Sequence, residues 1–249
     1  MIAEGMNKSI HINIIVMKKA FKITILLIIG FTSFKASCQT SEDKKTEISS
    51  DSLEIKKFWS WFKKNEKSFK DFEKNRDTVI SQILGACSVV NPALSIELES
   101  GVKGVINITF STNGEPKLIP VVQEIVKRAP KIKGWNIIAF RQKITTEQLK
   151  AKILEIDKKK FDPNTIKFKA TENEDKLDLI IYAKGISRSN FTDVSYQLSI
   201  LIDQVLGEYN CTMQINQIDY EELPKDKKLL SELKSLLELA DYVDAFYKK

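Results

Sequence analysis

The sequence predicts an α+β protein in which a mainly antiparallel sheet is covered by helices. Three observations support this fold class: short runs of alternating polar and apolar residues, apolar residues at helical spacing between those runs, and turn residues that join consecutive strands directly. Strands joined by a short turn pair in the antiparallel sense, because a parallel neighbour requires a long crossover. The order strand–strand–helix–strand occurs twice, from which we infer an internal duplication at the level of architecture.

The folded part is predicted to begin near Leu53 with helices rich in aromatic residues. The segment Phe58-Trp59-Ser60-Trp61-Phe62 is followed by apolar residues at roughly helical spacing as far as Leu84. Asn91-Pro92 is expected to end these helices, because proline disfavours helical backbone at the residue before it.

The first predicted unit consists of strands at 94–98 and 105–110, a helix at 118–128 and a strand at 135–140. Asn113-Gly114 marks the turn after its second strand, and Ala129-Pro130 ends its helix. The second predicted unit consists of strands at 166–170 and 177–183, a helix at 192–206 and a long strand at 209–220. Gly114 and Gly185 fall at matching places in the two units.

Two further helices complete the prediction. Thr145 to Asp157 has apolar residues at helical spacing and is predicted to be a helical connector. A leucine-rich helix is predicted from about Lys225 to Tyr247. The chain is accordingly divided into a signal peptide at 1–38, a flexible polar tether at 39–52, the N-terminal helices with the first unit at 53–144, and the connector, second unit and C-terminal helix at 145–249.

Residues 17–38 have the form of a bacterial export signal. Lys18, Lys19 and Lys22 form a basic start, and Ile23 to Phe34 is an apolar run too short to span a bilayer comfortably. We expect Met17 to be the true start of translation.

Two processing routes are compatible with the end of this signal. Lys35-Ala36-Ser37-Cys38 resembles a lipobox, in which the cysteine thiol is lipidated, although Lys35 stands where that pattern has an aliphatic residue. The sequence favours lipidation of Cys38, which makes the membrane the expected partner. Ordinary cleavage near Gln39 would instead release a secreted or periplasmic protein, and an uncleaved anchor is a third alternative.

Composition excludes several chemistries. His11 is the one histidine in the chain and lies upstream of the signal, so the mature chain would lack a Ser-His-Asp triad and histidine metal ligands. No phosphate-binding loop, metal-ligand cluster or nucleophile motif replaces it, and we expect no cofactor. Without residues 1–37, 34 basic residues face 32 acidic ones, which does not favour a nucleic-acid partner.

Four residues of the mature chain are candidates for a site. Trp59 and Trp61 lie between Phe58 and Phe62, and aromatic side chains at adjacent positions cannot all lie on one helical face. The two tryptophans are therefore a candidate surface for a protein or glycan partner. Burial of both in a core is the alternative. Asp203 and Glu208 are candidate carboxylates for acid–base work, although Gly207 between them is explained equally by the end of a helix.

Three other residues leave simpler choices open. Arg141 at a strand end can bind an anion or pair with a nearby carboxylate. Cys87 and Cys211 can form a disulfide or remain as two buried free thiols.

Three segments give the chain a resemblance to a group of bacterial proteins to which no activity is assigned. These segments are Phe58 to Phe62, the stretch from Ala129-Pro130 through Trp135 to Phe140-Arg141, and Leu206-Gly207-Glu208-Tyr209. The resemblance covers about residues 55–222. It implies that the three segments are architectural: a core clamp, a helix stop and a helix-to-strand turn.

The sequence therefore favours an exported cell-envelope lipoprotein with a binding or structural role and without catalytic activity. A carboxylate-dependent hydrolase-like enzyme is the first alternative, and it requires Asp203 and Glu208 to converge in a pocket with at least one raised pKa. A partner-binding adaptor that uses the C-terminal helix is the second, and it requires an apolar stripe of that helix to remain uncovered.

Overall fold

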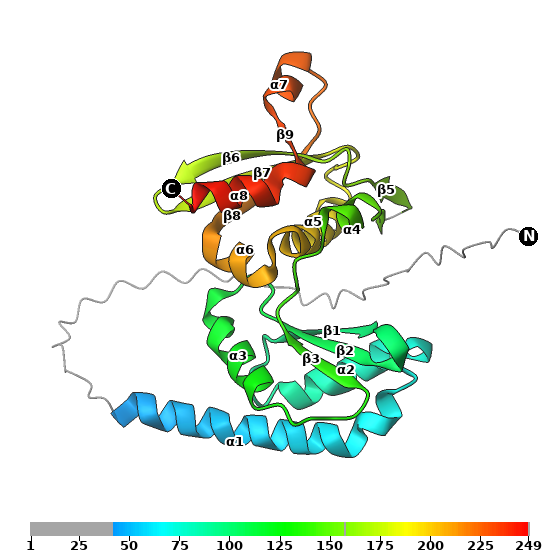
Figure 1. Cartoon of the computed structure of the whole chain (residues 1–249), viewed down its shortest axis with the longest axis vertical. Helices are drawn as coiled ribbons and strands as arrows, with labels where there is room; N and C mark the ends of the chain where they lie inside the picture. The colour runs from blue at the N-terminus through cyan, green and yellow to red at the C-terminus, as the bar shows by residue number, and fades with distance from the viewer. Residues whose placement is uncertain (1–41, 157, 249) are drawn as a thin grey trace, which may run out of the picture. The chain divides into compact units, whose positions relative to one another are not determined.

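The chain is α+β, as the sequence predicts, and a computed structural model describes residues 42–156 and 158–248, with side chains from Ser52 onward. It divides into two compact units, one extending to Val90 and one from Asn91 onward. Figure 1 labels the helices and strands of both. The export signal, Cys38 and His11 lie outside the described residues. Among those that are described, no helix combines the length and the apolar character needed to cross a bilayer.

The first unit is helical. It contains α1 (Glu42–Asn65), η1 (Glu66–Phe69), η2 (Phe72–Lys74) and α2 (Arg76–Cys87). Its aromatic side chains contact one another: the ring centroids of Phe58 and Trp59 lie 4.8 Å apart, and those of Phe62 and Phe69 lie 5.7 Å apart. The aromatic segment is therefore packed within this unit, and its large buried rings contribute strongly to packing. The core clamp that the resemblance implied stays a prediction.

Helix α1 begins earlier than the sequence predicted. Residues 42–52 were expected to be part of a flexible tether, but the helix starts at Glu42. The physical reason is propagation: once the aromatic end of a helix is packed, each further residue adds one hydrogen bond, and Glu and Lys are good helix formers. An absence of apolar periodicity therefore did not prevent helix formation.

The second unit contains a three-stranded sheet. Its strands are β1 (Ser95–Ser100), β2 (Ile106–Ser111) and β3 (Trp135–Ala139), in the order β1-β2-β3. β1 pairs antiparallel with β2, and β2 pairs parallel with β3. The crossover between the parallel strands contains η4 (Pro116–Leu118) and α3 (Ile119–Lys127), and a short turn, η3 (Val102–Gly104), joins the antiparallel pair.

The same unit contains a four-stranded sheet in the order β8-β7-β6-β9. Its elements are β6 (Lys167–Asn173), β7 (Lys176–Ala183), α5 (Phe191–Leu206), α6 (Glu208–Gln214), β8 (Ile215–Glu222) and β9 (Lys234–Ser235). Alternate residues of β7 are buried and join one hydrophobic core with the apolar face of α5 and with α8 (Leu239–Phe246). The alternation expected of a strand with one face on a core is thus present in β7.

The two sheets share a pairing pattern. β6 pairs antiparallel with β7, and β7 pairs parallel with β8, as β1, β2 and β3 do in the first sheet. They are separate sheets, and both belong to the compact unit 91–249, whereas the sequence-based division assigned them to 53–144 and 145–249. The inferred internal duplication remains a prediction.

The predicted connector helix at 145–157 is wrong beyond its first turns. Thr145 starts α4 (Thr146–Lys150) with a capping box that uses Gln148, and the helix ends there. The following residues form a hairpin of β4 (Leu154–Ile156) and β5 (Lys159–Phe161), with Lys158 at a φ of 62° in its turn. Over so few residues, the apolar positions of a short hairpin coincide with those of one face of a helix. The sequence pattern therefore could not distinguish a hairpin from a helix in this segment.

The predicted long strand at 209–220 and the predicted C-terminal helix are also corrected. The strand begins only at Ile215, because α6 occupies 208–214. The C-terminal segment is divided into α7 (Lys227–Glu232), β9, η5 (Leu236–Glu238) and α8. The division arises because Lys234 and Ser235 pair with β6 and the N–H of Leu236 donates to the carbonyl of Ile166. Tertiary pairing here overrides the helical pattern.

Candidate functional site

Arg141 lies at the centre of a buried polar cluster. It follows β3 directly, after Phe140, which has a φ of 63° and donates its N–H to the carbonyl of Phe110 at 2.8 Å. The Arg141 side chain is 3% exposed. Its guanidinium donates to Glu97 Oε1 at 2.6 Å, to Asp203 Oδ2 at 2.9 Å and to Asn113 Oδ1 at 2.9 Å. Together with Ser111, Thr112 and Glu208, these residues are termed the Arg141 cluster.

Glu208 is the most completely bonded member of this cluster. Its side chain is fully buried, and Oε1 accepts hydrogen bonds from Ser111 Oγ at 2.8 Å, Thr112 N at 2.7 Å and Thr112 Oγ1 at 2.8 Å. Oε2 accepts from the backbone N–H of Arg141 at 2.9 Å and lies 3.8 Å from its guanidinium. In return, the N–H of Glu208 donates to the carbonyl of Arg141 at 2.9 Å. Buried carboxylates require such pairing.

Gly207 sets the position of Glu208. It ends α5 and precedes α6 with a φ of 82° and a ψ of 127°, so the chain leaves one helix and starts another within a single residue. The positive φ agrees with the predicted helix end, but the backbone is not in the left-handed helical region. The motif Leu206 to Tyr209 is accordingly a helix-to-helix turn, not the helix-to-strand turn that the resemblance implied.

The charges of the cluster hold Arg141 protonated. Burial lowers the pKa of Arg141, but Glu97, Glu208 and Asp203 raise it, and the net shift is upward. One guanidinium thus faces three carboxyl groups, which stabilise its charge.

Asp203 has an unusual protonation equilibrium. Burial raises its pKa to about 6, and the Glu208 charge adds to the shift, whereas Arg141 acts in the opposite direction. The Cys211 thiol hydrogen-bonds to Asp203, and burial raises the pKa of that thiol well above its ordinary value. Cys211 therefore remains a protonated thiol rather than a nucleophilic thiolate.

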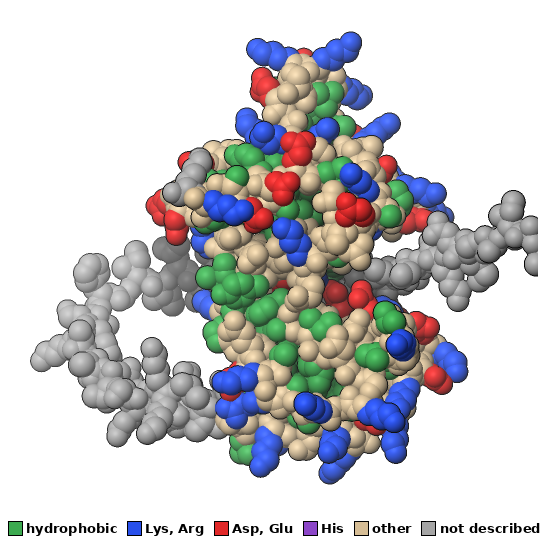
Figure 2. Space-filling view, in the orientation of Figure 1, with side chains coloured by type: hydrophobic (Ala, Val, Ile, Leu, Met, Phe, Trp, Pro, Cys, Tyr) green, Lys and Arg blue, Asp and Glu red, His purple; other side chains and the backbone are tan. Residues whose placement is uncertain are grey.

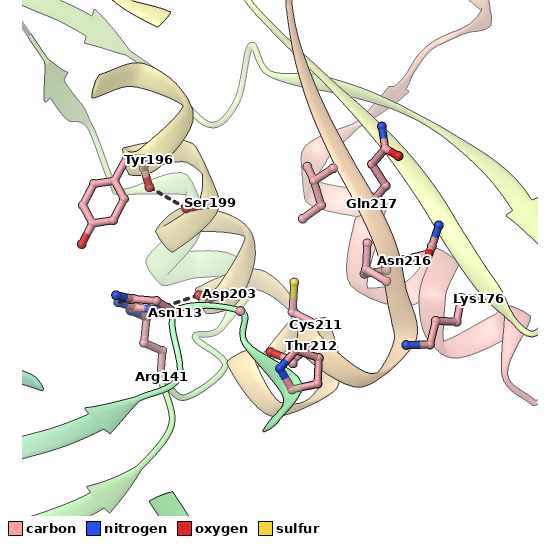
Figure 3. Close-up of a pocket in the computed structure, with 14 residues that line it drawn as sticks. Asn113, Arg141, Lys176, Tyr196, Ser199, Asp203, Cys211, Thr212, Asn216 and Gln217 are labelled. Carbon is pink, nitrogen blue, oxygen red and sulfur yellow. Dashed lines mark hydrogen bonds and ion pairs between the residues drawn. The ribbon is translucent and has the colours of Figure 1, made fainter. Parts of the chain in front are cut away.

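A pocket of about 420 Å³ opens beside the cluster. Figure 3 shows Arg141 and Asn113 next to Asp203, with Tyr196 and Ser199 on the same helix, α5. The residues that line the pocket are Asn113, Gly114, Pro116, Arg141, Lys176, Tyr196, Ser199, Asp203, Cys211, Thr212, Ile215, Asn216, Gln217 and Ile218. Polar groups of several kinds thus meet in one pocket, which is typical of a site for a small polar molecule.

Thr212 lines this pocket and has an unsatisfied hydroxyl. It is 8% exposed, and among the buried side-chain atoms that the structure describes, its Oγ1 has no hydrogen-bond partner. An unpaired buried hydroxyl costs free energy. Because this oxygen is enclosed, a bound molecule would contact it only after the pocket wall moved.

The structure brings Asp203 and Glu208 together at Arg141, but not in one pocket as the enzyme hypothesis required. Both contact Arg141, yet only Asp203 lines the pocket, whereas Glu208 is enclosed by the first sheet's donors. Of the two choices for Arg141, pairing with carboxylates is the one observed.

The predicted tryptophan surface is only partly present. Trp59 is 4% exposed, so the prediction that it contributes to an exposed patch is wrong. Trp61 is half-buried, with its ring 6.4 Å from Phe58 and 5.8 Å from Phe69. The neighbours of a helical residue decide its exposure, and the sequence motif could not distinguish the two rings.

The other candidates have simpler outcomes. Cys87 and Cys211 are buried free thiols, and burial raises the pKa of Cys87 to about 12. In the C-terminal segment, Leu236 and Val243 are buried in the core of the four-stranded sheet and Leu237 packs against it. The adaptor hypothesis therefore loses most of its apolar stripe. Among residues 42–156 and 158–248, no group of three or more His, Cys, Asp or Glu side chains is placed to hold a metal ion.

Sequence reasoning missed four of the seven residues of the cluster. Glu97 was assigned only to a strand and Asn113 only to a turn, and Ser111 and Thr112 were given no assignment. A signal was present, because Ser, Thr and Asn at the carboxyl end of an apolar strand offer hydroxyl and backbone donors close together. Nothing in the sequence indicated that Glu208, 96 residues after Thr112, would accept these hydrogen bonds.

Comparisons with protein-family models, with curated proteins and with solved structures returned no match. The cluster and the pocket are therefore interpreted from their geometry alone.

Proposed function

We propose that this chain is an exported, lipid-anchored protein of the bacterial cell envelope whose role is to bind a small polar molecule rather than to catalyse a reaction. The observation that supports the binding role is the combination of a fully bonded carboxylate and a polar pocket beside Arg141. The carboxylate that would be needed as a second catalytic group, Glu208, is fully bonded, and a polar pocket with an unsatisfied hydroxyl lies next to it.

The bonding of Glu208 supports a non-catalytic role. A general base must reach the proton that it abstracts, either directly or through one water. Both oxygens of Glu208 accept hydrogen bonds from the protein, and the side chain has no exposed surface. Glu208 is therefore expected to join the two sheets, not to touch a ligand.

The pocket lining supports a polar ligand. Lys176 offers an ammonium group, Tyr196 a phenol, and Asn216 and Gln217 amides. A small molecule with several hydroxyl, amide or carboxyl groups fits this mixture better than an apolar one. The export signal and Cys38 support delivery to the envelope.

The anchor is tested by the intact mass of the mature protein from membrane and soluble fractions of its native host. A mass that begins at Cys38 and carries a diacylglyceryl group, with or without an N-acyl chain, is the expected result. An unmodified mass that begins near Gln39 in the soluble fraction would contradict the anchor and leave the pocket proposal intact.

The pocket is tested by thermal unfolding of the full chain in a panel of amino acids, sugars and organic acids. A ligand that raises the Tm of the wild type should not raise that of Gln217→Trp, which places an indole at the pocket lining. Lys169→Trp, on an exposed position of β6 outside the lining, is the matched control and should keep the response. Equal loss of the response in both variants would contradict the pocket.

One observation favours a hydrolase-like enzyme as the second candidate. Asp203 lines the pocket with a pKa of about 6, which is close to the range where a carboxyl group exchanges protons efficiently. Hydrolysis of chromogenic ester, phosphate and glycoside substrates would test it, with Asp203→Asn compared with Asp193→Asn on the exposed start of α5. Turnover that is lost only in Asp203→Asn would overturn the non-catalytic proposal.

A further inference from the structure

The exposed face of α1 carries a series of lysines. Lys56, Lys57, Lys63 and Lys64 are exposed, and their spacing of one, six and one residues places them together with Ser60 on one side of the helix. Lys67 and Lys70 are exposed just beyond it. Figure 2 shows Lys and Arg side chains gathered over the segment that Figure 1 labels α1. Lys56, Lys57, Lys63 and Lys64 are termed the lysine face.

Few carboxylates compensate this face. Between Ser52 and Asn65 the one acidic residue is Glu54, which is half-buried and pairs with Lys57 at 2.7 Å. Residues 52–90 contain eight basic and five acidic residues, but residues 42–51 of the same unit add Glu42, Asp43, Glu47 and Asp51 against Lys44 and Lys45. Residues 42–90 thus contain ten basic and nine acidic residues, and 91–249 contain 24 and 23. The positive charge is therefore a local feature of the second half of α1.

Apolar side chains lie beside the lysines. Leu53 is 53% exposed and shares the face. Trp61 lies at its edge, half-buried and held by ring contacts to Phe58 and Phe69. The main apolar face of α1 is buried within its own unit, so the lysines with Leu53 and the edge of Trp61 form the surface that a membrane could contact. Lysine stems and a tryptophan ring can both lie in the headgroup region.

The position of α1 along the chain places it near the expected anchor. The helix begins at Glu42, four residues after Cys38, so the chain allows at most about 14 Å between them. This step rests on the proposed function, because it requires Cys38 to be lipidated. An anchored Cys38 would hold the start of a 24-residue helix within reach of the lipid headgroups.

From these observations we infer that the lysine face of α1 binds the anionic phospholipid headgroups of the membrane. A diacylglyceryl anchor has two acyl chains and holds a chain at the membrane by itself, so the contribution of a basic surface would be added affinity for anionic lipid and a fixed orientation. Each lysine near an anionic surface strengthens binding by about fivefold at ordinary ionic strength. The face would lay α1 along the bilayer and fix the orientation of the first unit on it.

The experiment compares the binding of the full chain to two kinds of vesicle, phosphatidylcholine alone and phosphatidylcholine with about one third phosphatidylglycerol. The ratio of the two affinities removes the contribution of the apolar N-terminal segment, which all variants share. We expect the wild type to prefer anionic vesicles by at least about tenfold, and the preference to fall as salt shortens the range of the interaction.

The test variant replaces Lys56, Lys57, Lys63 and Lys64 with glutamine. We expect its anionic preference to fall close to one, while the corresponding four arginine substitutions restore it. The matched control replaces four exposed lysines of the second unit, Lys131, Lys133, Lys227 and Lys228, with glutamine and removes the same charge. It should keep the preference. Circular dichroism and Tm should be unchanged, since all eight side chains are exposed.

Two results would overturn the inference: a wild type without anionic preference, or equal loss in the test and control variants, which would assign the effect to net charge. Failure of the anchor is seen separately in the intact mass. A lipidated protein without anionic preference would therefore contradict the lysine face alone, and an unlipidated protein that keeps the preference would contradict the anchor alone.

Discussion

The two sheets of residues 91–249 have the same pairing but contribute to the Arg141 cluster from different elements. The first sheet contributes from the ends of its strands: Ser111 ends β2, and Arg141 follows β3. The second contributes from its helices, with Asp203 on α5 and Glu208 on α6. The first sheet thus supplies the hydrogen-bond donors and the cation, and the second supplies two of the three carboxylates.

The difference arises in the crossover that each sheet uses. In the first, η4 runs directly into α3 between the parallel strands. In the second, Gly207 divides the crossover into α5 and α6, which places Glu208 in the first turn of a new helix. An acidic residue is favoured there by the helix dipole. One glycine therefore creates the position from which the second sheet reaches the first.

The largest expected effect comes from removing the carboxylate that joins the two sheets. Glu208→Ala leaves Ser111, Thr112 and the Arg141 backbone without their acceptor, and we expect the free energy of unfolding to fall by about 3–5 kcal/mol. Urea unfolding measures it. Glu155→Ala, on exposed β4, should change stability by less than about 0.5 kcal/mol. Similar losses in both variants would show that Glu208 does not join the sheets.

The second prediction concerns the pH dependence of Asp203. Its pKa in the folded protein, about 6, lies above the unfolded value of about 3.9. The stability from this group is therefore present below pH 3.9 and is lost as pH rises through 6. Relative to wild type, Asp203→Asn should gain about 2 kcal/mol between pH 4 and pH 7 in urea unfolding.

Asp193→Asn, at the exposed start of the same helix, is the control and should show little such gain. A difference between Asp203→Asn and wild type that moves in the opposite direction with pH would mean that Arg141 lowers the Asp203 pKa below its ordinary value.

The third prediction tests whether Gly207 is required by its backbone. Gly207→Ala meets Lys143 at an ordinary contact distance of 3.8 Å, so space is available, but its φ of 82° is unfavourable for any side chain. We expect a loss of about 1–2 kcal/mol in the free energy of unfolding. Gly85→Ala, in α2 with open space around it, should be neutral or stabilising. Equal effects would argue against a special turn at Gly207.

The smallest expected effect on the free energy of unfolding comes from removing the hydroxyl of Thr212, which has no hydrogen-bond partner in the structure. It is compared with removal of the bonded hydroxyl of Thr112. Thr212→Val removes a hydroxyl without a partner and should leave the free energy of unfolding unchanged or raise it by up to about 1 kcal/mol. Thr112→Val removes a hydroxyl that donates to Glu208 and should lower it by about 1–2 kcal/mol. Chemical denaturation of both measures the difference, and a destabilised Thr212→Val would reveal a partner for that hydroxyl.

The sequence predicted elements where local pattern and tertiary packing agree. The strands at 105–110 and 177–183 and the helix at 192–206 were predicted close to their positions, because alternation or helical spacing persisted over enough residues and turn residues bounded them. Predictions were wrong at 151–156, at 209–214 and at 233–235, where a strand interrupts the single helix predicted from about 225 to 247. At these places the apolar spacing fits more than one structure, and contacts with other elements decided the outcome.

For the candidate site, residue types alone establish which groups are present and which chemistries are excluded. It identified Asp203, Glu208 and Arg141 as polar groups near element ends, and the lack of histidine after His11 removed the commonest catalytic base.

The role of each of those groups depends on how the chain folds. Arg141 and Glu208 are 67 residues apart, and their pairing depends on two sheets and a glycine turn that bring them together. Residue type fixes charge and hydrogen-bonding capacity, but burial and partners set the protonation, accessibility and role of each group, and these arise from contacts that local sequence does not encode.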